Sequence, residues 1–125
     1  VVETIKSADI LVHGMGQAQV MAEKRGVDPC IIARLKEEGA VGEALGQYFS
    51  LDGRVVYSTD TLGLMVNDLE KIHTVMGIAG GHSKGPAILS VLRSGKQDIL
   101  VTDEAAAREI INCLQMENNH KLDNI

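Results

Sequence analysis

Three segments of the chain repeat one order of elements: a short apolar run, a few turn-forming residues, and then a helix-like pattern. The apolar runs cover residues 10–13, 75–79 and 99–101. Short apolar runs that alternate with helices are typical of parallel strands buried on both faces. Right-handed crossovers bring the ends of such strands, and the helix N-termini after them, to one edge of the sheet. The sequence therefore predicts an α/β fold with an open, mostly parallel, Rossmann-like sheet flanked by helices, and a ligand site along that edge.

The region between the first two segments predicts a separate helix and a hairpin. Asp28 can cap a helix that has Pro29 at its first position and stops at Gly39. Residues 42–57 then indicate two short strands joined by a turn at residues 52–53, which are Asp-Gly.

The composition limits the class of protein. With 125 residues, 45% hydrophobic and 23% charged, the chain fits a single domain spanning 1–125. A net charge of −5 argues against a nucleic-acid-binding surface, which needs a basic patch. No apolar stretch reaches the roughly 20 residues of a membrane span, and no signal-peptide pattern is present, so we expect a cytoplasmic protein. Cys30 and Cys113 lie far apart in apolar helical patterns, which predicts buried, reduced thiols and no metal site.

The two ends of the sequence carry expectations of their own. The chain opens on Val1-Val2-Glu3 rather than on a methionine, so we expect it to be a piece of a longer protein. The last ten residues, 116–125, are mostly polar and predict a frayed end.

The stretch after the second apolar run predicts an anion site. Gly80 and Gly81 let backbone N–H groups approach an oxyanion, Ser83 can donate a hydrogen bond, and Lys84 adds a positive charge at a helix start. The spacing of a Walker A loop is missing. A plain helix cap is the alternative for this corner, and His82 is either a ligand donor or a solvated loop histidine.

A glycine-rich turn also follows the first apolar run. Gly14-Met15-Gly16 is either a tight strand-to-helix turn or a loop that faces a ligand, and the glycine turn on the same sheet edge favours the ligand. No set of nucleophile, base and orienting residue is visible, so no catalytic residue is assigned and the sequence favours a binding site over a reaction.

Glu43 lies after an apolar pair and a glycine, in a stretch with few other charges. It is a candidate acceptor for sugar hydroxyls; the alternatives are a surface carboxylate or a partner for a nearby lysine. Lys24 and Arg25 end the first helix, where cations are ordinary partners of the helix dipole.

Four stretches, in this order and spacing, resemble the sugar-binding (effector) domain of SorC-type bacterial transcriptional regulators. They are "ADILVHGMG", "GAVGEALGQYFSLDGRVV", "GIAGGHSK" and "ILVTDEAAAREII". The resemblance covers nearly the whole chain, and the pairing of A-G-G-x-x-K with L-V-T-D-E-A-A-A is fairly specific. It implies a fold like that of phosphosugar isomerases and an effector domain that binds phosphorylated sugars to control DNA binding.

The resemblance also implies roles for individual residues. By position, Lys84 matches a phosphate-contacting lysine and Glu43 a sugar-contacting glutamate. Lys24 falls where the glycolytic regulators of the family carry a ligand-binding arginine, and lysine cannot reproduce the bidentate fork of arginine; Arg25 could compensate. The family's helix-turn-helix domain and its first effector segment have no counterpart here, so the chain corresponds to the C-terminal portion of an effector domain.

We therefore expect the ligand-sensing domain of a sugar-responsive transcriptional regulator. The expected effector is a phosphorylated sugar, with fructose-1,6-bisphosphate as the family-based candidate, and no cofactor or metal is implied. We expect a homo-oligomer that contacts DNA only through the missing N-terminal domain. The alternatives are a sugar-phosphate isomerase or a fragment of one, with Glu43 or His82 as base, and an oligomerisation module with a vestigial pocket.

Overall fold

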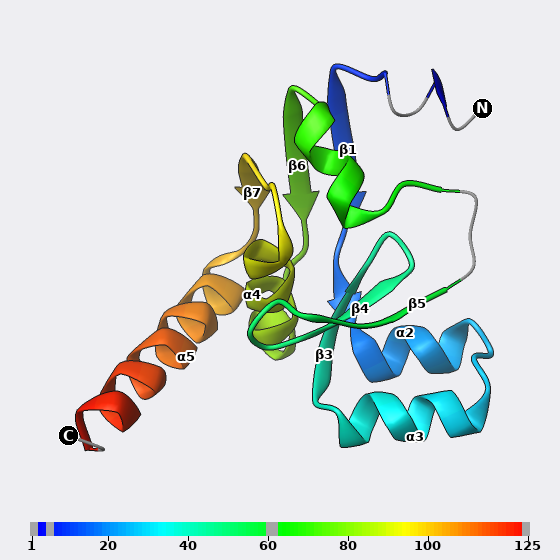
Figure 1. Cartoon of the computed structure of the whole chain (residues 1–125). Coiled ribbons are helices and arrows are strands. Elements are labelled where there is room, and N and C mark those ends of the chain that lie inside the picture. The colour runs from blue at the N-terminus through cyan, green and yellow to red at the C-terminus, as the bar shows by residue number, and fades with distance from the viewer. Residues whose placement is uncertain (1–2, 5–6, 60–62, 124–125) are drawn as a thin grey trace.

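The computed structural model describes residues 3–4, 7–59 and 63–123, and this part of the chain contains two sheets (Figure 1). One is parallel, in the order β1-β6-β7, and the other is antiparallel, in the order β2-β3-β4-β5. The strands are β1 (Ile10–Gly14), β2 (Gly16–Gln17), β3 (Ala40–Ala44), β4 (Gln47–Ser50), β5 (Val55–Ser58), β6 (Thr74–Ile78) and β7 (Ile99–Val101). The helices are α2 (Ala18–Lys24), α3 (Pro29–Glu37), α4 (Gly85–Ser94) and α5 (Glu104–Asp123), with 3-10 turns η1 (Val66–Lys71) and η2 (His82–Lys84). The α/β class and the parallel sheet of the three apolar runs are confirmed.

The three parallel strands end together at one edge of their sheet. Gly14 pairs with Ile78, and Ile78 pairs with Val101. From this edge the chain continues into α2 through β2, into α4 through η2, and directly into α5. The helix starts therefore gather at the strand ends, as the sequence predicts.

Helix α4 lies between α5 and strand β3 of the antiparallel sheet and forms the centre of the main core (Figure 1). Its buried Ile88 and Val91 belong to the same apolar cluster as Phe49 of β4. The helix also lies unusually close to β3, because Gly42 has no side chain: a Cβ there would lie 2.1 Å from Oγ of Ser90. With so few aromatic residues, the core depends on close approach of this kind between backbone and aliphatic side chains.

The parallel sheet is not buried on both faces, so that prediction is wrong for this chain. One face packs against α4 and η1 through residues such as Leu11, Val75 and Leu100. The other face is apolar and open: Ile10, Val12, Ile78, Ile99 and Val101 are each between 41% and 61% exposed. The pairing register sets these side chains in neighbouring rows, so they form one continuous surface, which we call the open sheet face.

Helix α3 begins as predicted. The side chain of Asp28 accepts a hydrogen bond from the N–H of Cys30 at 2.8 Å, and Pro29 occupies the first turn. Gly39, with φ +77°, follows the end of the helix. The expected burial of Cys30 is wrong, since its position on the first turn faces solvent; Cys113 is half-buried, and both thiols are free.

The hairpin region holds one strand more than expected. The turn at residues 52–53 joins β4 and β5 as predicted, but β3 precedes them and pairs with β4. The connection between β3 and β4 is Leu45-Gly46, with φ +56° and +79°, which is the backbone of a type I′ turn. Leucine is uncommon there, since a left-handed backbone costs an L-residue about 1–2 kcal/mol.

The prediction of a frayed C-terminal end is wrong for residues 116–123, which belong to α5, and residues 124–125 lie outside the described residues. Arg93 of α4 donates two hydrogen bonds, at 3.0 and 2.7 Å, to the carboxylate of Glu117. This bidentate pair holds the second half of α5 against α4, although the residues concerned are 24 positions apart.

The open sheet face should make a polypeptide of residues 1–125 self-associate, because an apolar surface of this kind is stabilised by contact with another one. Changing Val12 and Ile78 together to threonine keeps β-branched side chains on the strands and makes the face more polar. We expect sedimentation velocity at high concentration to show oligomers of the wild-type chain and mainly monomer of the double variant.

Val20→Thr on α2 is the matched control, since Val20 is 42% exposed outside the sheet. It should associate like wild type. Equal sedimentation of wild type and double variant would show that this face is not the associating surface.

Candidate functional site

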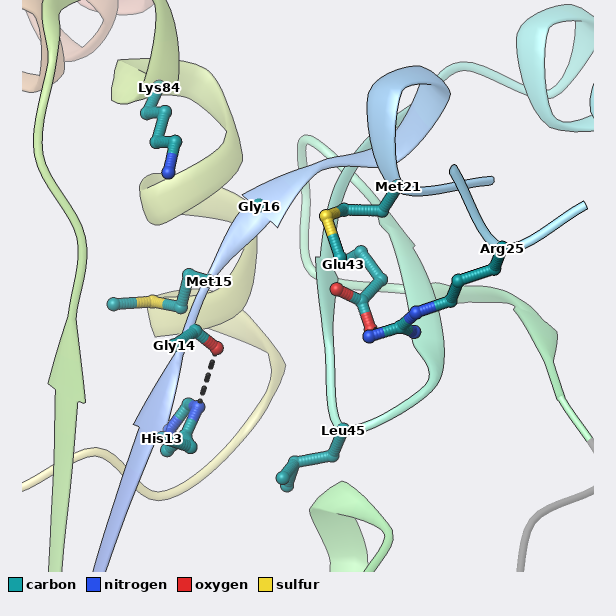
Figure 2. Close-up of a pocket in the computed structure, with 9 residues that line it drawn as sticks. All are labelled: His13, Gly14, Met15, Gly16, Met21, Arg25, Glu43, Leu45 and Lys84. Carbon is teal, nitrogen blue, oxygen red and sulfur yellow. Dashed lines mark hydrogen bonds and ion pairs between the residues drawn. The ribbon is translucent and has the colours of Figure 1, made fainter. Parts of the chain in front are cut away.

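A cavity of about 360 Å³ lies where β1 ends and α2 begins (Figure 2). We call it the strand-end cavity. Its lining residues come from the first sheet segment, from α2 and its end, from the β3–β4 hairpin and from η2: His13, Gly14, Met15, Gly16, Met21, Arg25, Glu43, Leu45 and Lys84. The cavity therefore lies along the predicted edge of the parallel sheet.

Glu43 is the buried charge of this cavity, with only 3% of its surface exposed. Its Oε1 accepts a hydrogen bond from Nη1 of Arg25 at 2.6 Å and a second from the N–H of Gly46 at 3.0 Å. The other oxygen, Oε2, lies on the side of Gly16. The alternative of a surface carboxylate is therefore wrong, and the partner of Glu43 is an arginine rather than a lysine.

Arg25 takes the place at the cavity that the resemblance assigns to Lys24. Lys24 is the last residue of α2, is exposed, and is not among the residues lining the cavity. Burial alone would lower the pKa of Arg25, but the hydrogen bond and negative charge of Glu43 raise it overall. Arg25 is therefore a permanent cation at the cavity wall, with 42% of its side chain still exposed.

Lys84 reaches the cavity from the opposite direction, at the start of α4, as Figure 2 shows. The expectation that the backbone at Gly80 and Gly81 offers N–H groups to an anion is wrong in part. The N–H of Gly81 donates to Oδ2 of Asp103 at 2.8 Å, that of Lys84 to the carbonyl of Gly81 at 3.0 Å, and that of Gly85 to the carbonyl of His82. The side chain of Lys84, and not the glycine backbone, is what this corner presents to the cavity.

The remaining residues of the glycine corner do not line the cavity. Gly80 and Gly81 lie against Asp103, whose Oδ2 would be 2.7 Å from a Cβ at Gly80. The His82 ring is exposed, with Nε2 2.9 Å from Oε2 of Glu109. The carbonyl of Ser83 accepts a hydrogen bond from the side chain of Gln17 at 2.9 Å.

Half of the ten residues expected at the site are thus brought together. Gly14, Met15, Gly16, Glu43 and Lys84 line the cavity, whereas Lys24, Gly80, Gly81, His82 and Ser83 do not.

Sequence reasoning missed four lining residues: His13, Met21, Arg25 and Leu45. His13 is buried, its Nε2 lies 2.8 Å from the amide oxygen of Gln97, and its Nδ1 lies 3.1 Å from the carbonyl of Gly14. The sequence signal for His13 is its position, at the end of an apolar strand and directly before a glycine turn. The sequence presents Arg25 as a partner of the helix dipole and as a possible substitute for the family's arginine, without placing it at the site, and Leu45 carries no signal.

The described residues show neither a group of metal ligands nor a membrane-spanning helix. Within residues 3–4, 7–59 and 63–123, no three His, Cys, Asp or Glu side chains are grouped so that they could hold a metal ion. No helix of the same residues is long and apolar enough to span a bilayer.

A family model described as a sugar-binding domain matches residues 1–112. The chain belongs to this family. Curated relatives are the central glycolytic genes regulators of Bacillus subtilis, 39% identical over 111 residues, and of Priestia megaterium, 42% identical over 107 residues. These matches cover 89% and 86% of the chain but only 33% and 31% of the two regulators, so the chain spans about a third of their length.

Solved structures agree with this assignment and with the fold. A protein from Enterococcus faecalis described as a SorC family transcriptional regulator superposes with a TM-score of 0.83 at 39% identity, over 89% of this chain and 45% of that one. The full-length sorbitol operon regulator SorC of Klebsiella pneumoniae superposes with a TM-score of 0.74 at 21% identity, over 86% and 37% of the two chains, which shows the shared fold. The resemblance to SorC-type regulators is confirmed, and these relatives give the isomerase alternative no support.

The contact between Arg25 and Glu43 should stabilise the fold of this sugar-binding domain. Removing the cation leaves a buried carboxylate without its charged partner, whereas Glu43→Gln removes the charge and keeps an acceptor for Gly46. We expect Arg25→Met to lower the free energy of unfolding by about 1–3 kcal/mol, since the half-exposed arginine leaves water some access to Glu43. We expect a smaller loss for Glu43→Gln.

Urea unfolding of the two single variants and the double variant measures the coupling. The double variant should regain most of the stability that Arg25→Met loses. If the free energy of unfolding of Arg25→Met is no lower than that of Glu43→Gln, the ion pair does not stabilise the fold.

Proposed function

We propose that the chain is the ligand-sensing domain of a sugar-responsive transcriptional regulator and that it binds a phosphorylated sugar in the strand-end cavity. One observation carries the proposal: the ammonium group of Lys84 and the buried carboxylate of Glu43 line the same cavity in a chain of the sugar-binding-domain family. The first suits a phosphate and the second suits hydroxyl groups, and a sugar phosphate carries both.

The charges around the cavity favour an anion. Lys84 and Arg25 both line it, and Glu43 offsets one of their charges. The cavity wall is therefore positive in a chain whose net charge is −5. A cationic site in an acidic protein attracts an anionic ligand locally without attracting nucleic acid over the whole surface.

Glu43 is placed to accept hydroxyl groups. Oε1 accepts the hydrogen bonds from Arg25 and Gly46, and Oε2 lies toward Gly16 at the cavity. A sugar hydroxyl that donates to Oε2 would form a charge-assisted hydrogen bond, which is about twice as strong as a neutral one. The salt bridge with Arg25 holds the carboxylate in place for this contact.

The effector would act by shifting the population of two arrangements of the regulator. Asp103 provides a physical link, because its Oδ2 accepts from the N–H of Gly81 and its Oδ1 accepts from the N–H of Ala106 in the first turn of α5. A ligand that reorients Lys84 would thereby act on the start of α5. We propose fructose-1,6-bisphosphate as the effector. The regulator would be a homo-oligomer in which another part of the protein contacts DNA.

The same geometry argues against an isomerase reaction at this site. His82, one of the two bases considered, does not line the cavity. Glu43, the other, accepts hydrogen bonds at Oε1 from Arg25 and from the N–H of Gly46, so this oxygen is already engaged and is not open to a substrate proton.

Replacing Lys84 with alanine in the complete protein should weaken binding of fructose-1,6-bisphosphate or fructose 6-phosphate by about 1.5–3 kcal/mol, the range for hydrogen bonds to charged groups. This corresponds to roughly a ten- to hundredfold loss of affinity in calorimetric titration. Lys84→Arg should recover only part of it, because a planar fork does not fit where a point charge is placed.

Lys24→Ala is the matched control, since Lys24 is exposed and lies outside the cavity lining. It should leave affinity unchanged, and unphosphorylated fructose should bind wild type and Lys84→Ala equally. If Lys84→Ala loses affinity equally for fructose and for its phosphates, or for neither, the phosphate binds elsewhere.

A further inference from the structure

Leu45 occupies a backbone conformation that leucine rarely adopts. It is the one non-glycine residue with positive φ among those that the structure describes, and it holds the first of the two turn positions between β3 and β4. Asparagine, aspartate and glycine are the residues that suit this position of a type I′ turn. Strain of this kind persists where the surrounding structure requires the side chain.

The side chain of Leu45 stands between two cavities. A second cavity of about 500 Å³, which we call the side cavity, adjoins the strand-end cavity and is lined by Arg25, Val27, Leu45, Gly46, Thr59, Gly63 and Leu64. Among the residues that the structure describes, Arg25 and Leu45 are the two that line both cavities. They form the wall that separates them.

The two halves of this wall are held in different ways. Arg25 is fixed by its salt bridge with Glu43. Leu45 is fixed by its turn and by packing against two apolar clusters, one around Phe49 and Ile88 and the other around Leu69. Leu45 is nevertheless only partly buried, so part of its side chain faces the cavities.

We propose that Leu45 is a specificity-determining residue that limits the ligand to the phosphate of a single sugar. The proposal rests on the proposed function of the strand-end cavity. A phosphate held by Lys84 places one sugar ring beside Glu43, and a second ring would have to pass the wall into the side cavity. In the side cavity the hydroxyl of Thr59 donates to the carbonyl of Gly46 at 2.8 Å, and its oxygen could still accept a hydrogen bond from such a ring, so it is Leu45 that excludes the ring.

Leu45→Gly tests this directly, because glycine adopts the turn without strain and removes the wall. The probes are fructose 6-phosphate and trehalose 6-phosphate, a monosaccharide phosphate and a disaccharide phosphate, titrated into the complete protein. Wild type should bind the disaccharide phosphate at least about tenfold more weakly, the range for exclusion by a shaped pocket. In Leu45→Gly this ratio should fall at least about tenfold, with the affinity for fructose 6-phosphate changed by less than about threefold.

Two further variants keep the result interpretable. Asparagine also suits the turn, so Leu45→Asn should likewise lower the ratio of the affinities for fructose 6-phosphate and trehalose 6-phosphate. It provides a second measurement if the glycine variant folds poorly. Leu92→Ala is the matched control, because Leu92 is a partly buried leucine that packs on the same cluster and lines neither cavity. It should leave the selectivity ratio at the wild-type value.

An unchanged ratio in Leu45→Gly and Leu45→Asn would overturn the proposal and leave Leu45 a packing residue. Failure of wild type to bind fructose 6-phosphate or any other monosaccharide phosphate would instead overturn the proposed function. In that case a crystal structure of Leu45→Gly still decides the role of the wall: one continuous cavity supports it, and two separate cavities contradict it.

Discussion

Helix α4 lies directly against strand β3, and this close approach sets the geometry of the site. A Cβ at Gly42 would lie 2.1 Å from Oγ of Ser90 and 2.6 Å from the carbonyl oxygen of Ala87, so only glycine permits the contact. Glu43 is the next residue on β3, and Lys84 directly precedes α4. One backbone contact therefore fixes the strand that carries the carboxylate relative to the helix start that carries the ammonium group.

The charges of the cavity follow from this arrangement. Glu43 is almost fully buried, and a buried carboxylate is tolerated only where hydrogen bonds and a counter-charge compensate for the loss of water. Arg25 and the N–H of Gly46 supply both. Lys84 then adds a positive charge that forms no ion pair with a carboxylate of the described residues. This excess of one cation makes the cavity suited to an anionic ligand.

The sequence predicts those parts of the fold that depend on local patterns. The apolar runs predict the parallel strands, and Asp28 with Pro29 predicts the start of α3. The failures involve contacts between distant segments. An apolar strand has the same pattern whether or not a helix covers it, and the pairing of Arg93 with Glu117 extends α5 across a separation that no local pattern reveals.

The site also contains residues that local sequence patterns predict and residues whose place depends on contacts between distant segments. Gly14-Met15-Gly16 and Lys84 follow strands, so their place at the sheet edge is predictable. Lys24 and Arg25 are neighbours of similar chemistry, and only the direction in which the chain leaves α2 decides which one reaches Glu43. The N–H of Gly81 donates to Asp103, 22 residues away, and the turn before Gly46 has leucine where asparagine, aspartate or glycine would indicate a hairpin.

A crystal structure of the complete protein with fructose 6-phosphate tests the central claim most directly. The account predicts a phosphate oxygen within about 2.7–2.9 Å of Nζ of Lys84, the range for charged N–H to oxygen hydrogen bonds, and a sugar hydroxyl on Oε2 of Glu43. A phosphate bound in the side cavity, or on the outer surface at His82 and Ser83, would contradict it.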